Sequence, residues 1–229
     1  MEKVMDHYHT LLIYEYYKKL LNYFGKQNWW PGDSKLEIAI SAILTQNTSW
    51  RNVEKSIEKL KHLNLLPKSE NNYLKYAQKI YNLDNEKLKE IIKPCGFYNS
   101  KVKTIKNFLK FLIENKGFEG LSYLNDFELR KKLLEIKGIG NETADCIMLY
   151  VFDRFSFVID NYTIRILNRH NIKFKNYYEY KQFIENNIPK DIEIYKEFHA
   201  LFVITGKKFC KKHKMDCENC PLGLYKISK

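Results

Sequence analysis

The sequence predicts an all-α protein, and three observations support this fold class. Glycine and proline are scarce, with nine and five residues in a chain of 229, so few positions interrupt a helix. Apolar residues recur at spacings of three and four, which places them on one helix face. The clearest series is Val53, Ile57, Leu60 and Leu63. A hydrophobic content of 45% can supply the core of one large domain or two small ones.

Two helices are predicted on either side of a glycine turn at residues 138–140 (Gly-Ile-Gly). Asn125 and Glu128 have the spacing of a capping box at the start of the first helix, which the turn is expected to end. Asn141 is expected to cap the second helix, which runs through residue 152. Together the two helices form a hairpin.

The turn of the hairpin predicts an anion site. Its paired glycines let the backbone turn tightly and bring N–H groups close to a ligand at a helix N-terminus. Lys and Arg outnumber Asp and Glu by 39 to 27, which gives a net charge of +12. The anion that this charge favours is a nucleic-acid phosphate.

Composition also bounds the location of the protein. No apolar run reaches the roughly 18 residues that a membrane span needs, and the N-terminus lacks the apolar stretch of a signal peptide. A cytoplasmic protein that associates with the nucleoid through DNA, with no membrane partner, is therefore expected. Nothing in the sequence indicates an oligomer, so a monomer is expected.

Further motifs accompany the hairpin, at residues 44–48 (Leu-Thr-Gln-Asn-Thr), at residues 96–101 (Gly-Phe-Tyr-Asn-Ser-Lys) and at three cysteines near the end. Together with Asp160, they cover almost the whole chain. In this order they resemble the helix-hairpin-helix DNA glycosylases of the endonuclease III superfamily. Residues 138–145 are most similar to the 3-methyladenine DNA glycosylase branch.

The resemblance implies a base-excision-repair enzyme with a two-lobed fold, whose cleft holds damaged double-stranded DNA. A six-helix barrel is expected over residues 30–156, with the helix-hairpin-helix at about 133–152. The other lobe is expected to combine residues 1–29 with residues 157–229, including a Cys-rich loop at 210–220.

Asp160 is the catalytic residue that the resemblance implies. A glycosylase must stabilise the positive charge that develops on the sugar and must place a water molecule, and one carboxylate can do both. By residue type alone, Asp160 also fits the N-cap of a helix from Tyr162 through Leu167. The two roles are compatible.

Glu142 stands where bifunctional members of the family carry the lysine that attacks the sugar. A glutamate cannot form an imine, so the resemblance implies a monofunctional glycosylase without AP lyase activity. An acidic residue in the first turn of a helix also complements the helix dipole. That alternative explains the glutamate without restoring a lyase.

The resemblance assigns Trp30, Pro31, Trp50 and Lys207 to a base pocket. An alkylated purine such as 3-methyladenine carries positive charge, and the face of an aromatic ring attracts a cation. Residue type alone leaves two other roles open: tryptophans that pack between lobes, and a Lys207 that contacts phosphate. A related branch would take uracil, mismatched thymine, adenine opposite oxidised guanine or an oxidised pyrimidine instead.

Other residues are expected to contact DNA. The resemblance implies that Gln46 fills the space left by a flipped nucleotide, while Phe97 and Tyr98 insert from the opposite side. On residue type alone, a helix-terminal glutamine and core aromatics are the alternatives. Phosphate contacts are expected from Lys101, Lys137, Gly138 and Gly140.

Cys210, Cys217 and Cys220 match the spacing of the first three ligands in the family's [4Fe–4S] loop. Lys226 occupies the fourth position, and an ammonium group cannot replace a thiolate. A labile or vestigial cluster with three cysteine ligands is favoured. A cluster completed by His213 or an external ligand, a zinc ion held with His213, and no metal are the alternatives.

Two other function classes stay open at this point. One is a glycosylase with AP lyase activity supplied by another lysine. The other is a non-catalytic helix-hairpin-helix module that only binds DNA. Asp160 argues against the second class, because phosphate binding needs no carboxylate.

Overall fold

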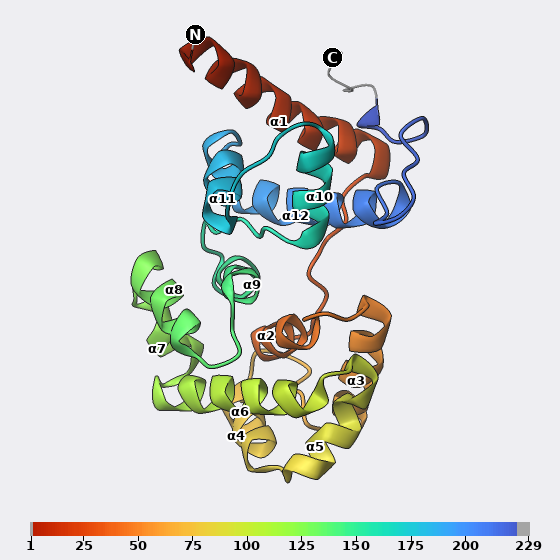
Figure 1. Cartoon of the computed structure of the whole chain (residues 1–229). Helices are drawn as coiled ribbons and strands as arrows, with labels where there is room; N and C mark the ends of the chain where they lie inside the picture. The colour runs from red at the N-terminus through yellow and green to blue at the C-terminus, as the bar shows by residue number, and fades with distance from the viewer. Residues whose placement is uncertain (1, 224–229) are drawn as a thin grey trace. The chain divides into compact units, whose positions relative to one another are not determined.

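Figure 1 shows the computed structural model, which describes residues 2–223, with side chains from residue 13 onward. Within this range the chain forms helices joined by turns and loops, and its only β-type pairing is an isolated bridge between Cys210 and Met215. The predicted all-α fold class is confirmed.

The chain divides into two compact units: Met1–Trp29 with Phe155–Lys229, and Trp30–Arg154. The first unit contains α1 (Glu2–Phe24), α10 (Asn161–Arg169), α11 (Tyr177–Asn186) and α12 (Ile192–Lys208). The second contains α2 (Lys35–Leu44), α3 (Trp50–His62), α4 (Tyr73–Asn82), α5 (Asn85–Ile92), the 3-10 turn η1 (Lys93–Cys95), α6 (Tyr98–Glu114), α7 (Gly117–Ser122), α8 (Asp126–Glu135) and α9 (Asn141–Phe152).

In the unit Trp30–Arg154, α2 and α9 form much of the core. α2 packs against α9, α6 and α3, and eight of its ten residues are buried. Every residue of α9 from Thr143 onward is buried as well. Helices that are apolar on all sides are typical of a protein core. The outer helices α4 and α5 pack on α6 (Figure 1).

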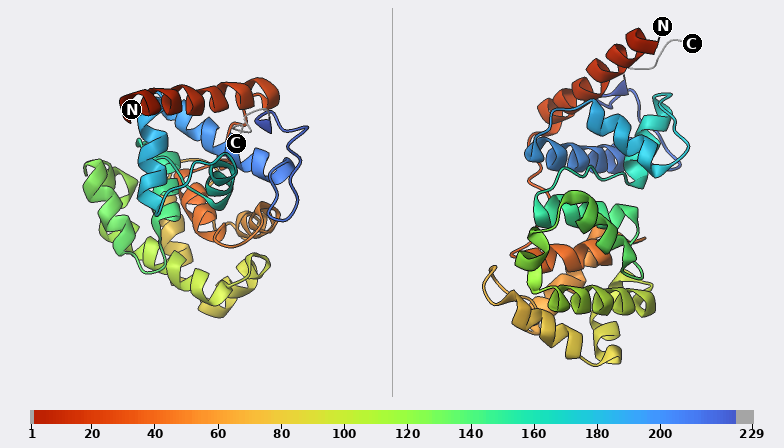
Figure 2. Two further views of the ribbon diagram at one scale, coloured as in Figure 1. Left: turned by 45° about the horizontal axis from the view of Figure 1, so that its top comes forward. Right: turned by 90° about the vertical axis from the view of Figure 1, so that its left-hand side faces the viewer.

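The unit Met1–Trp29 with Phe155–Lys229 is built around α12, which packs against α1 and α10. Figure 2 shows the red α1 alongside the blue α12 from two further directions. Phe198 of α12 stacks on Phe202, with ring centroids 4.3 Å apart, and meets Tyr17 and Phe157 edge-on. Phe157 lies three residues before Asp160, so the core of this unit holds the backbone that leads to that carboxylate.

The capping box at the start of α8 is confirmed. The Asn125 side chain accepts from the backbone N–H of Glu128, while the Glu128 carboxylate accepts from the backbone N–H of Asn125. The two bonds satisfy donors that the first helical turn leaves without partners.

Three local predictions were wrong. α8 ends at Glu135, before Gly138, because Ile136 is already extended. Gly140 rather than Asn141 is the N-cap of α9, and Asn141 is its first helical residue. Leu63 is 50% exposed, because it follows α3 as the C-cap instead of continuing the buried face.

Candidate active site and nucleic-acid interface

The turn between α8 and α9 requires glycine at its first position. Gly138 has a φ of +102°, and an added Cβ would lie 2.0 Å from Thr104 Oγ1 of α6. No atom lies within 4 Å of the corresponding position at Gly140. Gly138, Gly140 and Lys137 are all exposed. The hairpin tip thus packs on α6 at Gly138 and leaves open space at Gly140, at the start of α9.

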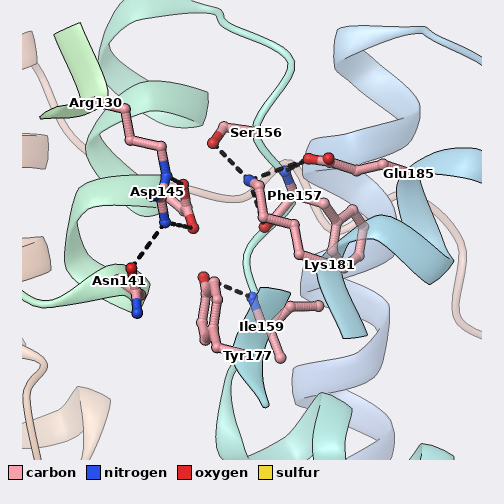
Figure 3. A network of polar contacts seen from close by, with 9 residues as sticks. All are labelled: Arg130, Asn141, Asp145, Ser156, Phe157, Ile159, Tyr177, Lys181 and Glu185. Carbon is pink, nitrogen blue, oxygen red and sulfur yellow. Dashed lines mark hydrogen bonds and ion pairs between the residues drawn. The ribbon is translucent and has the colours of Figure 1, made fainter. Parts of the chain in front are cut away.

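A buried ion pair joins the two helices of the hairpin (Figure 3). Arg130 of α8 donates from Nε to Asp145 Oδ1 at 2.8 Å and from Nη2 to Asp145 Oδ2 at 3.0 Å. The same Nη2 donates to Asn141 Oδ1 at 3.0 Å. The Asp145 side chain is fully buried. Bidentate Arg–carboxylate pairs fix orientation as well as distance, so this pair sets the angle of the hairpin.

Residues 44–48, which we call the Gln46 segment, contact the hairpin directly. Gln46 Nε2 donates to the carbonyl oxygen of Gly138 at 3.0 Å and to Thr143 Oγ1 at 2.9 Å. Three residues predicted to contact DNA, Gln46, Gly138 and Gly140, are therefore brought together around the turn. The amide nitrogen of Gln46 is already engaged there, so filling a gap in DNA requires the side chain to rotate or to use its oxygen.

Residues 96–98, which we call the Phe97 segment, project aromatic side chains outward. Phe97 is 69% exposed and Tyr98 is 37% exposed. Phe97 has a φ of +47° and immediately precedes α6, a backbone conformation that is uncommon for a bulky residue. The alternative that these residues are core aromatics is wrong, because neither ring is buried.

The structure contradicts the phosphate contact that was predicted for Lys101. Its side chain is 2% exposed, and its ammonium donates to the carbonyl oxygens of Leu44 at 2.9 Å and Cys95 at 2.8 Å. Burial lowers the pKa of this ammonium. The prediction failed because a lysine in a basic sequence can still face the core when carbonyl groups replace water.

The two predicted pocket aromatics lie together in the unit Trp30–Arg154. The Trp30 ring meets the Trp50 ring edge-on, with centroids 5.5 Å apart, and lies 5.3 Å from the Tyr150 ring. Trp30 Nε1 donates to Ser41 Oγ at 2.7 Å. The Trp30 ring is therefore held in one orientation.

A cavity of about 240 Å³ lies beside Trp50, and Trp30 and Lys207 are not among its lining residues. It is lined by Pro31, Gly32, Asp33, Glu37, Ser41, Trp50, Glu54, Ile57, Glu58 and Lys61. Lys61 forms ion pairs with Asp33 and Glu37. Four carboxylates and one ammonium give the lining a net negative formal charge, which contrasts with the basic chain as a whole.

Lys207 belongs to the other unit, where its Nζ lies 5.8 Å from the centre of the Trp29 ring. The neighbouring backbone is held by Glu197 of α12, whose carboxylate accepts from the backbone N–H groups of Gln27 and Asn28, both at 2.7 Å. α12 thus holds the backbone that precedes Trp29.

Asp160 is the N-cap of α10, as one of its two predicted roles requires. Its Oδ1 accepts from the backbone N–H of Thr163 at 2.7 Å, and its Oδ2 lies 3.8 Å from His199 Nε2. The residue is 8% exposed. Burial alone would raise the pKa of Asp160, but His199 and the Thr163 N–H outweigh it and hold the pKa below its usual value. Asp160 is therefore ionised at neutral pH.

The extended segment before Asp160 is held by α11 (Figure 3). Lys181 donates to Ser156 Oγ at 2.7 Å and forms an ion pair with Glu185 at 3.1 Å. Glu185 in turn accepts from the Phe157 backbone N–H at 2.7 Å, and Tyr177 Oη lies 3.3 Å from the Ile159 backbone nitrogen. These contacts align the backbone that delivers the carboxylate.

Glu142 is an exposed residue in the first turn of α9, two residues after Gly140. An acidic side chain at a helix N-terminus is electrostatically favourable. The first turn of α9 therefore presents a carboxylate at residue 142 and no amine.

The three cysteines near the end are not gathered into a metal site. Among the side chains that the structure describes, residues 13–223, no three from His, Cys, Asp or Glu are placed to hold a metal ion. Cys210 Sγ instead accepts a hydrogen bond from Arg169 Nη1 at 3.0 Å, and burial raises the pKa of the Cys220 thiol. Lys226 lies outside the described residues.

Within the part of the chain that the structure describes, no helix is both long and apolar enough to cross a bilayer.

Comparison with known proteins identifies the family. Residues 40–221 match the model of the HhH-GPD superfamily base excision DNA repair proteins. The chain belongs to this family. It is 48% identical to a Methanocaldococcus jannaschii protein provisionally named DNA repair glycosylase MJ1434, over 95% of this chain and 97% of that protein. The predicted resemblance is thereby confirmed, and the protein is a base-excision-repair DNA glycosylase.

Two solved structures share the fold. The Helicobacter pylori 3-methyladenine DNA glycosylase MagIII, bound to 1,N6-ethenoadenine, has a TM-score of 0.75 and 29% identity, over 87% of this chain and 97% of that chain. An endonuclease III trapped as a covalent intermediate with DNA has a TM-score of 0.74 and 18% identity, over 93% of both chains. The second likeness concerns the fold alone.

Several residues that organise this glycosylase escaped the sequence analysis. Arg130 and His199 carry no local motif, because their partners lie 15 and 39 residues away in the chain. One signal was present: Asp145 is a charged residue within the apolar stretch of α9. A buried carboxylate needs a partner, so that position predicts a paired cation without saying which one.

Proposed function

We propose that this glycosylase is monofunctional and removes alkylated purines such as 3-methyladenine. Asp160 assists hydrolysis of the glycosidic bond, and the product is an abasic site in an unbroken strand. Glu142 carries the proposal of monofunctional chemistry, because the exposed first turn of α9 presents a carboxylate where an attacking amine is needed for imine formation.

The cavity beside Trp50 supports a cationic base as the substrate. Its lining combines an indole ring and Pro31 with the carboxylates of Glu54 and Glu58. An aromatic face attracts a cation by roughly 0.5–2 kcal/mol, depending on desolvation, and nearby carboxylates add to the attraction. The likeness to a 3-methyladenine glycosylase at 29% identity points to the same substrate class.

Asp160 supplies two steps of the reaction. As the positively charged base departs, the ionised carboxylate stabilises the charge that develops on the sugar. The same carboxylate accepts a proton from the attacking water. An alkylated purine needs little protonation to leave, so the proposal requires no separate general acid.

The test is base release from duplex DNA that carries a radiolabelled methyl group. Released bases are separated by chromatography, and strand breaks are measured before and after alkali. Duplexes with uracil or oxidised bases are treated in parallel. The proposal predicts labelled 3-methyladenine and breaks only after alkali. Release of another base instead would contradict the substrate, and breaks before alkali would contradict the monofunctional chemistry.

Asp160→Asn separates catalysis from DNA binding, and Asp191→Asn is its matched control. Asp191 is also an aspartate N-cap in the same unit, at the start of α12, and asparagine caps helices about as well as aspartate. We expect Asp160→Asn to bind DNA without releasing base, whereas Asp191→Asn keeps both activities. Equal loss of binding and release in Asp160→Asn would contradict a catalytic role.

A further inference from the structure

Two segments that are predicted to enter DNA meet at one buried ammonium group. Leu44 begins the Gln46 segment, and Cys95 immediately precedes the Phe97 segment. The Lys101 ammonium donates to the carbonyl oxygens of both residues, at 2.9 and 2.8 Å. One side chain therefore links the start of the Gln46 segment to the residue just before the Phe97 segment, although the two segments are about fifty residues apart in the chain.

Each segment contains one residue with a positive φ. Phe97 has a φ of +47°, a region that a bulky residue adopts only where the surroundings hold it. Asn47 has a φ of +52°, a conformation that asparagine adopts more readily. Phe97 is also largely exposed, so its own ring contributes little packing. The buried hydrogen bonds from Lys101 lie at the start of one segment and just before the other, so they are well placed to hold these conformations.

The carbonyl groups of Leu44 and Cys95 are the polar partners of the Lys101 ammonium. Cys95 is the titratable neighbour that affects Lys101, and burial raises the pKa of its thiol. Cys95 Sγ hydrogen-bonds to Ser56 Oγ at 3.2 Å, so the sulfur is directed toward α3. Charge-assisted bonds to carbonyls in a buried site are strong, and removing the donor leaves both acceptors unsatisfied.

We propose that Lys101 is a positioning residue that couples the Gln46 segment to the Phe97 segment, so that both enter the duplex in register when a nucleotide is extruded. The inference rests on the proposed function in one respect, namely that both segments contact DNA. A side chain that fills the gap and a ring that enters from the opposite side act together only at a fixed separation.

Hydrogen exchange in the free protein tests the coupling without DNA. The variants are Lys101→Met and, as matched control, Lys103→Met, which removes an exposed lysine from the same helix. We expect amide exchange at Thr45 and Gly96 to become about tenfold faster in Lys101→Met, which is the scale of one net hydrogen bond. Exchange at Ile139 in the hairpin stays unchanged, and Lys103→Met behaves as wild type.

Base extrusion tests the consequence. A duplex with 2-aminopurine beside an abasic-site analogue reports unstacking by a rise in fluorescence. Lys101→Met is expected to lose about tenfold in the extrusion equilibrium, while its Kd for undamaged duplex stays that of wild type. Lys101→Arg, which keeps a buried cation with several donors, recovers part of the signal.

Unchanged exchange at Thr45 and Gly96 would overturn the proposal, and so would an equal loss of extrusion and of binding to undamaged duplex. If Lys101→Met does not fold, Lys101→Gln, which keeps donor hydrogens without the charge, is judged by the same two measurements. A wild-type protein that releases no base, together with faster exchange in Lys101→Met, would count against the proposed function and leave the coupling intact.

Discussion

The two units fix their candidate functional groups in different ways. In Trp30–Arg154, exposed groups at loops and at the hairpin are held by buried side chains that reach between distant segments, as Lys101 and Arg130 do. In the other unit, one buried carboxylate, Asp160, is held by Thr163 of its own helix and by His199 of α12, while α11 holds the extended segment before it. Because the groups proposed for DNA contact and the carboxylate proposed for catalysis are held by different residues, we expect that substitutions can weaken DNA binding and catalysis separately.

The largest expected difference between the two units comes from a substitution at Asp160. Asp160→Asn is expected to lower the rate of base release by at least about 100-fold, the scale for removing one charged group that stabilises a transition state. Affinity for damaged duplex stays close to that of wild type, since asparagine preserves the helix cap. Single-turnover release and a binding titration on the same preparation measure the two effects.

Arg130→Met breaks the hairpin brace in the other unit. Removing one partner of a buried ion pair costs about 3–5 kcal/mol, because Asp145 is left charged and fully buried. Denaturant unfolding measures this loss, and DNA affinity falls with it. Lys89→Met is the control, because its pair with Glu86 is exposed and contributes about 0–1 kcal/mol. A stability loss in Arg130→Met no larger than the control's would contradict the brace.

His199→Gln tests the surroundings of Asp160 through the pH dependence of base release. Because His199 helps to hold the pKa of Asp160 below its usual value, the substitution raises that pKa and moves the acid limb of the base-release profile to higher pH. In wild type, the depressed pKa contributes stability above the unfolded pKa of aspartate, and this is lost as pH falls through the folded pKa. An acid limb that does not move would show that His199 has no influence on Asp160.

Glu142→Lys places an amine in the first turn of α9, just after the glycine turn. We expect borohydride to trap a covalent complex with abasic DNA, while the released base remains the same. Gel electrophoresis of the trapped complex and chromatography of the base measure the two outcomes. A changed base preference would mean that residue 142 contributes to the pocket, which the account does not include.

Asn125→Ala has the smallest expected effect. Loss of the capping box at α8 lowers the free energy of unfolding by about 0.5–2 kcal/mol, with Asp160-dependent base release unchanged at low temperature. Thermal unfolding measures the change. A loss of activity larger than the loss of folded protein would show that the start of α8 also contacts DNA.

Local patterns predicted much of this molecule. The capping box at Asn125 and the cap at Asp160 depend on residues only three positions apart, so the sequence contains both partners. The hairpin followed from its glycines, although its exact cap did not, since the backbone is still extended at Gly140 and becomes helical only at Asn141.

Burial was the property that the sequence could not supply. Lys101 lies among several lysines, and only the packing of α6 shows that it faces two carbonyl groups instead of phosphate. For the cysteines, too, the sequence pattern did not show which groups they contact. Their spacing matched a cluster loop, but within the described residues Cys210 is engaged by an arginine.

The most direct test of the account is a single-turnover reaction on a duplex with one 3-methyladenine, in which released base and strand integrity are measured together. We expect stoichiometric release of 3-methyladenine from wild type, with an intact strand and no borohydride-trapped complex, and release at least about 100-fold slower from Asp160→Asn. Strand cleavage with a trapped complex, or release from Asp160→Asn at the wild-type rate, would contradict this mechanism.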